Sequence, residues 1–272
     1  MPELYKKNFI NLIKKKENEN YSFFTECTVT INNTQFKYLV CNVDLDLLKC
    51  AVELAKVKSK FTMSQNQASI PRDSVTKLQK CAQGVLAEMF IHILLVHRYD
   101  FKVLRYDLER QSFIYSTEEY DLKIYISNDF YEVESRSSNI HHRSIKKFIM
   151  EDVIIGPYGN KVKIEDELAD FHFRPIYVPD FIPFTSENGK YHYSENMING
   201  DIKLVITGVA TKEDFLNHGF RQTLGQKGTS YQVVKVLVAG DIDDMDNKFS
   251  QIMEWLIKSD LAQLRVRSLF FS

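Results

Sequence analysis

The stretch STEEYDLKIYISNDFYEVESRSS, residues 116–138, decides how the rest of the chain is interpreted. β-Branched and aromatic residues alternate with charged residues on both sides of a polar segment around Asn128, and Asn and Asp favour turns. We therefore expect two strands, at 121–127 and 130–136, folded together as a β-hairpin. Residues two apart in a strand share a face of the sheet.

Charged side chains gather on this predicted hairpin. Asp121 and Lys123 share a face of the first strand, and Glu132, Glu134 and Arg136 share a face of the second. Neighbouring carboxylates repel one another, and Mg²⁺ relieves that repulsion with one or two carboxylates plus water. The pattern predicts a Mg²⁺ site, open also to Mn²⁺, with Asp121, Glu132 and Glu134 as ligands. The alternative is a solvated edge strand whose charges pair with neighbours.

An acidic residue also lies inside the strongest helical pattern of the chain, over residues 73–98. Glu88 stands in GVLAEMFIHILL, with apolar residues on nearly every side of the predicted helix. A carboxylate in such surroundings is costly to bury unless it is paired, protonated or bound to a cation. We expect Glu88 to point at the hairpin carboxylates. The alternative is an ion pair with His92, four residues later, or with a lysine.

Further elements are predicted on both sides of this region. Strands are expected at 101–106 and 112–116; residues 149–200 lack a regular pattern, and after them we expect a strand at 201–209, a helix at 212–218, a loop at 219–230, a strand at 231–239 and a helix at 246–258. Strands bracketed by helices in this order predict an α/β fold with a mixed central sheet flanked by helices.

The first 60 residues predict a small α+β unit of their own. Its elements would be a helix, a hairpin and a helix, at 3–16, 22–41 and 44–57. The polar stretch at 58–71 is expected to be a boundary. The predicted organisation is therefore an N-terminal unit over 1–60, which grips DNA or forms a dimer, followed by a catalytic domain over 72–272.

The helix and hairpin together resemble a known group, the PD-(D/E)xK phosphodiesterases, and type II restriction endonucleases in particular. The resemblance covers roughly residues 73–240 and implies a restriction-endonuclease-like α-β-β-β-α-β core. Glu88 resembles the acidic residue of the first core helix. Asp121, which follows Tyr120 rather than Pro, resembles the aspartate at the start of the second strand.

The third motif of the family departs from its pattern here. In the register Glu132-Val133-Glu134, the D/E-x-K tripeptide has Glu in place of Lys. A second register, residues 134–136, puts Arg136 there instead, and arginine keeps its proton, so it could stabilise charge but not act as a base. Lys123 could also supply the missing cation. The resemblance implies a catalytic set of Glu88, Asp121, Glu132, Glu134, Lys123 and Arg136.

A second match to the same motif stands further along the chain. Pro179-Asp180 is followed by Asp201-Ile202-Lys203, which has the literal spacing P-D…D-x-K. Asp180 lies in a proline-rich region without a clear strand pattern. No acidic helix of matching character precedes this second match. This match stays open as an alternative site.

Two segments have the side chains expected of a DNA-binding surface. Basic residues follow the predicted second strand and suit phosphate contacts: Arg143, Lys146 and Lys147. The loop predicted at 219–230 combines side chains that contact base edges in the major groove: Arg221, Gln222, Gln226 and Lys227. A solvated helix start and an ordinary connecting loop are the alternatives.

Composition restricts the class of protein. Hydrophobic residues make up 44% and charged residues 26% of the 272, which excludes extended disorder. The chain has 35 basic and 36 acidic side chains, so a uniformly basic nucleic-acid coat protein is excluded but a local basic surface is not. The four cysteines form no CxxC pair, which excludes a zinc ribbon. No apolar run approaches the ~20 residues of a membrane span, so we expect a cytoplasmic protein.

The function that these patterns favour is a Mg²⁺-dependent endonuclease that cuts double-stranded DNA as a type II restriction enzyme. A homodimer is expected, because cutting both strands of a duplex needs two active sites. The first alternative is a non-catalytic DNA-binding or assembly module on the same fold. The second is an interaction protein that needs no metal and whose acidic patch meets a basic partner.

Overall fold

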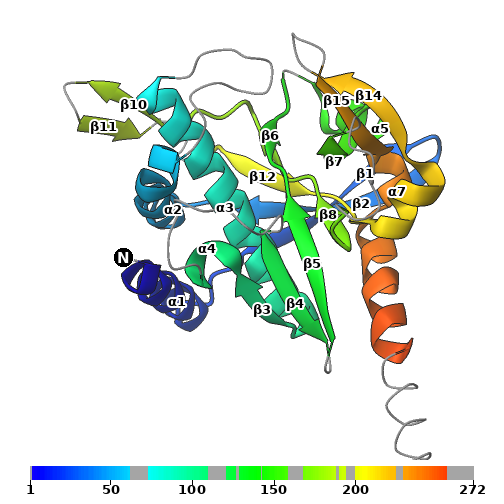
Figure 1. Ribbon diagram of the computed structural model, residues 1–272, viewed down its shortest axis with the longest axis horizontal. Helices are drawn as coiled ribbons and strands as arrows, with labels where there is room; N and C mark the ends of the chain where they lie inside the picture. Colours follow the sequence, from blue (N-terminus) through cyan, green and yellow to red (C-terminus); the bar gives the residue numbers. More distant parts are fainter. Residues whose placement is uncertain are drawn as a thin grey trace, which may run out of the picture.

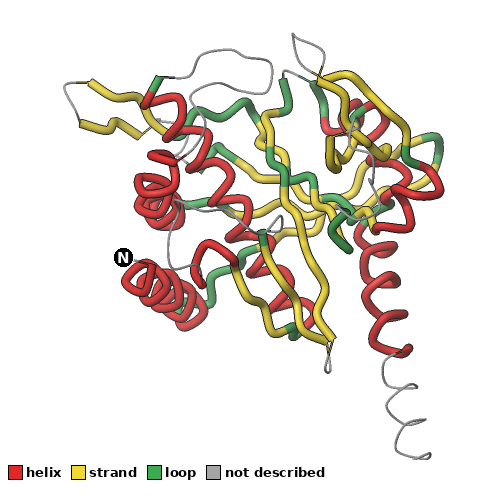
Figure 2. The backbone as a smooth tube through the Cα atoms, in the orientation of Figure 1, coloured by secondary structure: helices red, strands yellow, loops and turns green. Residues whose placement is uncertain are grey.

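The structure is a computed structural model, and it describes residues 2–61, 73–109, 121–126, 129–141, 143–158, 168–187, 190–193, 200–224 and 229–255. Over these residues the protein is mixed α/β (Figures 1 and 2), with strands in several sheets and helices around them. This confirms the α/β class with a mixed sheet.

The helices and strands have the following bounds. The helices are α1 (Pro2–Asn18), α2 (Leu45–Lys58), a 3₁₀ turn (Ser59–Phe61), α3 (Ser74–Tyr99), α4 (Tyr106–Glu109), α5 (Ile145–Glu151), α7 (Lys212–His218), α8 (Val236–Ala239) and a helix over 242–255. The strands are β1 (Phe24–Ile31), β2 (Thr34–Asn42), β3 (Lys102–Arg105), β4 (Leu122–Ile126), β5 (Asp129–Ser135), β6 (Ser138–Asn139), β7 (Val153–Tyr158), β8 (Phe171–Phe173), β9 (Ile176–Val178), β10 (Phe184–Glu187), β11 (Lys190–Tyr193), β12 (Lys203–Ile206), β13 (Ala210–Thr211), β14 (Phe220–Leu224) and β15 (Thr229–Lys235).

The predicted hairpin lies at the centre of one five-stranded sheet, in the order β13-β8-β5-β4-β3. β4 pairs with β5 antiparallel, with Leu122 opposite Val133 and Lys123 opposite Glu132. β3 pairs with β4 antiparallel, and β5 pairs with β8 parallel. The antiparallel pairing of β4 and β5 confirms the hairpin, whose turn residues lie outside the described ranges.

The N-terminal hairpin belongs to a second five-stranded sheet, in the order β1-β2-β12-β9-β6. β1 and β2 join through Asn32 and Asn33, whose φ angles of 48° and 68° are ones that asparagine tolerates. β2 then pairs with β12 from the far end of the chain. Residues 1–60 and 72–272 thus share a sheet, and the functional division between them stays a prediction.

Helix α3 is the centre of the core. Asp73 caps its first turn by accepting the Thr76 N–H at 2.6 Å, and Asp100 ends it in the left-handed conformation with φ 55°. Its buried residues pack against α2 on one side and against β3, β4 and β5 on another (Figure 1). By length and composition α3 could cross a membrane, yet 72% of its most apolar window is buried inside the fold.

Several predicted bounds were wrong. Residues 149–200, which lack a clear pattern, include β7 to β11 and the end of α5. The predicted loop over 219–230 is mostly hairpin, because β14 pairs with β15. Polar side chains on both faces of β14 hid its strand pattern. The predicted strand at 231–239 ends at Lys235 and continues as α8. The strand expected at 112–116 lies outside the described residues.

Candidate active site

Two buried carboxylates and a lysine, from three parts of the chain, meet beside α3. Glu88 lies midway along α3, and Asp107 lies in α4, directly after β3; each is 5% exposed. The Lys58 ammonium at the end of α2 joins them, with its Nζ 2.6 Å from Asp107 Oδ2 and 3.2 Å from Glu88 Oε1. This arrangement brings a cation from the N-terminal segment into contact with the acidic residue predicted on the core helix.

Arg105 supplies a second cation to Glu88. It lies on β3, is almost fully buried, and its guanidinium is 3.3 Å from Glu88 Oε2. The expected alternative partner, His92, instead packs its ring edge-on against Phe9. An ion pair with a lysine, the other alternative, is confirmed. Neither cation could be assigned to the site from the sequence, because Lys58 begins the polar stretch predicted to be a boundary and Arg105 lies in a predicted strand.

Asp121 stands where β4 begins, beside the end of β5. Its Oδ2 accepts the Ser135 N–H at 2.8 Å. The neighbouring Glu134 contacts the Nε of Arg136 and lies 3.6 Å from Nδ1 of the buried His172. An antiparallel hairpin places the start of one strand beside the end of the other, so Asp121 meets residues 134–136 at this end of the hairpin.

Two carboxyl groups, those of Glu88 and Asp121, have raised pKa values. Burial raises the pKa of Glu88 to about 7, with the Lys58 charge opposing the rise and the charge of Asp121 adding to it. Burial also raises the pKa of Asp121 to about 6; Lys58 opposes that rise and Glu134 adds to it. A buried site with perturbed carboxylates is a candidate functional site on physical grounds.

The remaining hairpin residues of the predicted set lie away from this centre. Lys123 and Glu132 face each other in the strand register, with 3.7 Å between Nζ and Oε1, and the Lys123 ammonium lies over the ring of Phe130. Residues two apart are separated by roughly 6.6 Å along a strand. Glu132 therefore pairs with Lys123, whereas Glu134 lies next to Asp121.

The three carboxylates predicted as metal ligands do not form one close group in the structure. Within the described residues, no three His, Cys, Asp or Glu side chains are grouped closely enough to hold a metal ion. The assignment of Asp121, Glu132 and Glu134 as metal ligands stays a prediction. In the strand register, Glu132 lies two positions before Glu134 on β5 and faces Lys123. Asp121 and Glu134 remain together.

The second match to the motif has a different geometry. β9 and β12 pair antiparallel, with Lys203 opposite Val178, so Asp180 follows the end of one strand and Asp201 precedes the start of the next. Asp180 accepts the His141 N–H at 2.6 Å, and Asp201 is exposed. Neither aspartate joins a buried carboxylate group of the described residues, in contrast to Asp121.

The residues predicted to bind DNA lie in different settings. Arg143 bonds to Asp152 at 2.6 Å and to the Ile140 carbonyl, so it links parts of the protein. Lys146 and Lys147 lie exposed on α5. Arg221 is exposed and Gln222 half-buried on β14. Gln226 and Lys227 lie outside the described residues.

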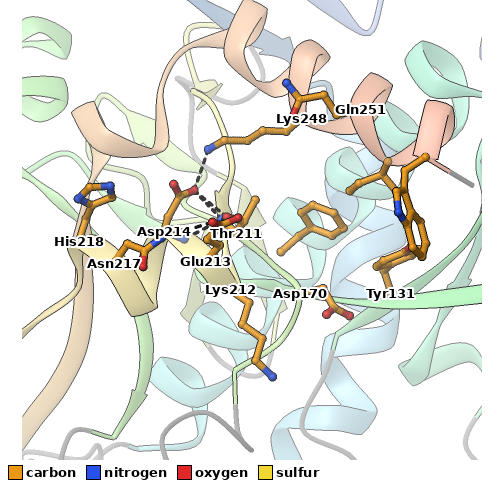
Figure 3. A pocket seen from close by; sticks show the side chains of 13 residues that line it. Tyr131, Asp170, Thr211, Lys212, Glu213, Asp214, Asn217, His218, Lys248 and Gln251 are labelled. Carbon is orange, nitrogen blue, oxygen red and sulfur yellow. Dashed lines mark hydrogen bonds and ion pairs between the residues drawn. The ribbon is translucent and has the colours of Figure 1, made fainter.

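A separate cavity of about 520 Å³ lies between β8, α7 and the 242–255 helix. Figure 3 shows Asp214 and Lys248 bonded to each other at its wall, and Lys248 also donates to two main-chain carbonyls. Trp255, 63% exposed, and Tyr131 line another side. The side chains that line the cavity include both acidic and basic groups, and some of them bond to other parts of the protein. The lining therefore does not indicate one class of ligand.

Comparisons with known proteins add little to this geometry. No protein-family model matches the chain, and no solved structure matches it. The chain is 22% identical over 227 residues to an uncharacterised protein of Methanocaldococcus jannaschii, an alignment that covers 75% of this chain and 82% of that protein. The candidate function therefore depends on the side chains and the order of the elements.

Proposed function

We propose that this chain is a Mg²⁺-dependent endonuclease of the PD-(D/E)xK type, which hydrolyses phosphodiester bonds of double-stranded DNA as a type II restriction enzyme. The observation that carries the proposal is that Asp121 lies beside the end of β5 that carries Glu134, and that the charge of Asp121 also acts on the buried Glu88 of α3. The resemblance implies carboxylates from these same three elements.

The order of the elements supports the same proposal. α3 is followed by β3, β4 and β5, then by α5, and then by β8, which pairs with β5 in parallel. With α4, β6 and β7 as insertions, this is the α-β-β-β-α-β order implied by the resemblance. The sheet order also keeps these strands adjacent. Both observations favour a restriction-endonuclease-like core.

The carboxylates present fit one divalent metal ion. Asp121 and Glu134 would hold it, because Mg²⁺ takes one or two carboxylates plus water. Burial is the main cause of the raised pKa of Asp121, and the charge of Glu134 adds to the rise. When bound, the metal lowers the pKa of its water and stabilises charge on the phosphodiester. The contact between Glu134 and Arg136 favours the 134–136 register of the motif. There the guanidinium would stabilise negative charge on the phosphate.

Two observations favour the first alternative, a non-catalytic DNA-binding module on the same fold. The third motif position of the 134–136 register is an arginine, and no trio of metal-binding side chains is grouped among the described residues. A site of this kind could bind DNA without cutting it. The two functions differ in metal-dependent cleavage and agree in salt-sensitive DNA binding.

The decisive experiment is cleavage of a long unmodified phage DNA by the purified protein with Mg²⁺ or Mn²⁺. Wild type should give discrete fragments, and EDTA should prevent them. Asp121→Asn preserves an acceptor for the Ser135 N–H but removes the charge that holds the metal. Its cleavage rate should fall at least 100-fold, while its melting temperature and its DNA affinity measured in Ca²⁺ stay close to wild type.

Asp129→Asn is the matched control, because Asp129 is an exposed aspartate at the other end of the same hairpin. It should cut at the wild-type rate. Unchanged cleavage by Asp121→Asn would remove the site assigned here. A wild type that binds DNA but never cuts it, with either metal, would support the binding module instead.

A further inference from the structure

The lysine of the proposed active site has no counterpart on the strand where the family pattern places it. Lys123 forms an ion pair with Glu132 and a cation–π contact with Phe130, further along the hairpin. Arg136, in the motif position, contacts Glu134. The ammonium group that does enter the carboxylate centre comes from α2, in the segment predicted to be a separate N-terminal unit.

Lys58 contacts two carboxylates at once and acts on a third. Its Nζ lies 2.6 Å from Asp107 and 3.2 Å from Glu88, both on elements of the predicted core. Its charge is also the strongest one acting on the Asp121 carboxyl. The side chain keeps 28% of its surface exposed, whereas those of Glu88 and Asp107 keep 6%. Lys58 thus lies at the solvent side of the carboxylate centre.

The position of Lys58 is fixed by packing. Leu47, Leu48, Ala51 and Val52 are fully buried on α2, which packs against α3. Asp44 caps the start of α2 by accepting the Leu47 N–H. A side chain held by a buried helix is more precisely placed than one on a loop.

We propose that Lys58 supplies the ammonium group of the active site and holds Glu88 and Asp107 in place, so that the site is complete only when the N-terminal segment is packed on α3. This inference rests on the proposed function. Lys58 is a positioning residue in this account: it stabilises neighbouring carboxylates and leaves Asp121 and Glu134 for the metal. The charges favour it, because Lys58 contacts both Glu88 and Asp107 and its charge also acts on Asp121.

The test compares Lys58→Met, Lys58→Arg and Lys56→Met in the full chain. Lys56 is the matched control, since it lies on the same helix and its contacts are with the exposed Glu53 and with Tyr191. Single-turnover cleavage, DNA affinity in Ca²⁺ and melting temperature are measured for each variant. Lys58→Met should lower the cleavage rate about 100-fold, and Lys56→Met should not change it.

Lys58→Arg separates positioning from mere charge pairing. It keeps the positive charge, so the fold and DNA affinity should stay near wild type even if Lys58→Met is destabilised. Its larger planar group cannot take the place of a compact ammonium, so its cleavage rate should fall about tenfold or more. Wild-type cleavage by Lys58→Arg, or by a folded Lys58→Met, overturns the role of Lys58 and leaves the nuclease proposal intact. Absence of cleavage by wild type overturns both.

Discussion

Glu88 shows what a single buried carboxyl does to the molecule. It lies in the long, largely buried helix α3 and is held by Lys58 and Arg105. Even with two cations, burial raises its pKa to about 7. A carboxyl whose pKa is raised by folding stabilises the folded state only while it holds its proton. That stabilisation is complete below pH 4.5, the ordinary pKa, and is lost as the pH rises through about 7.

The resulting prediction concerns Glu88→Gln, measured by urea unfolding at pH 5 and pH 8. The free energy of unfolding of wild type should fall more between these two pH values than that of the variant, by about 2 kcal/mol. The comparison with wild type cancels the opposite effect of buried His92 and His172, each with its pKa lowered by burial to about 3. Parallel pH dependences would mean that Glu88 is ionised throughout.

At the scale of elements, β14 has an unexpected form. The segment predicted as a loop is a strand with exposed Arg221 and half-buried Gln222, paired to β15 in a three-stranded sheet with β7. β14 is an outer strand of this sheet, and strands of some DNA-binding proteins contact bases in a groove of DNA. Lys146 on α5, by contrast, is an exposed cation on a helix, which suits a phosphate contact.

These two positions predict different effects on DNA binding. Gln222→Ala should reduce the preference for cognate over random DNA by roughly 1–3 kcal/mol, because a base contact is lost. Lys146→Ala should weaken binding to both DNAs alike and lower the salt dependence by about one unit of slope. Titrations of both variants at several salt concentrations measure this. Equal effects of Gln222→Ala on both DNAs would exclude β14 as a base-contacting element.

Local sequence patterns predicted helices and strands more accurately than they predicted which of these elements contact one another. The hairpin of β4 and β5, the turn at Asn32-Asn33 and the helix at 212–218 follow from alternation, turn residues and helical spacing, and the structure confirms them. The strand β14 is hard to predict because polar side chains on both of its faces obscure the alternation of apolar residues. Pairings such as β2 with β12 depend on long-range packing that no local pattern contains.

The candidate site was predictable only in part for the same reason. A carboxylate in an apolar helix is conspicuous, so Glu88 stood out, and Asp121 follows from the hairpin geometry. Lys58, Asp107 and His172 lie in segments with ordinary patterns, and only the fold brings them to Glu88 and Glu134. Glu132 was included because face alternation alone does not specify which strand end meets Asp121.

At the scale of the whole molecule, the first 60 residues pack against elements from the rest of the chain. β2 lies between β1 and β12, and α2 packs against α3. Six residues of α2 are buried there: Leu47, Leu48, Ala51, Val52, Leu54 and Ala55. Each large apolar side chain left exposed costs about 1.5–3 kcal/mol, which is a large share of a typical domain's stability.

We therefore expect a protein truncated to residues 72–272 to lose cooperative folding. Removal of β2 would open the edge of β12, and removal of α2 would uncover α3. Circular dichroism and thermal melting of the truncated protein measure this directly. A sharp melting transition in the truncated protein would instead show that 72–272 folds as an independent domain, as the sequence pattern predicts.

The pairing of β2 with β12 also has a consequence during synthesis. β2 leaves the ribosome long before residues 203–206 exist, because about 160 residues separate the partners in the chain. At a translation rate of about 5–20 residues per second, the edge of β2 that pairs with β12 stays unpaired for roughly 8–32 seconds. An uncovered strand edge is a template for association with other chains. The nascent protein should therefore depend on chaperones over this interval, and slower translation should lower the yield of soluble protein.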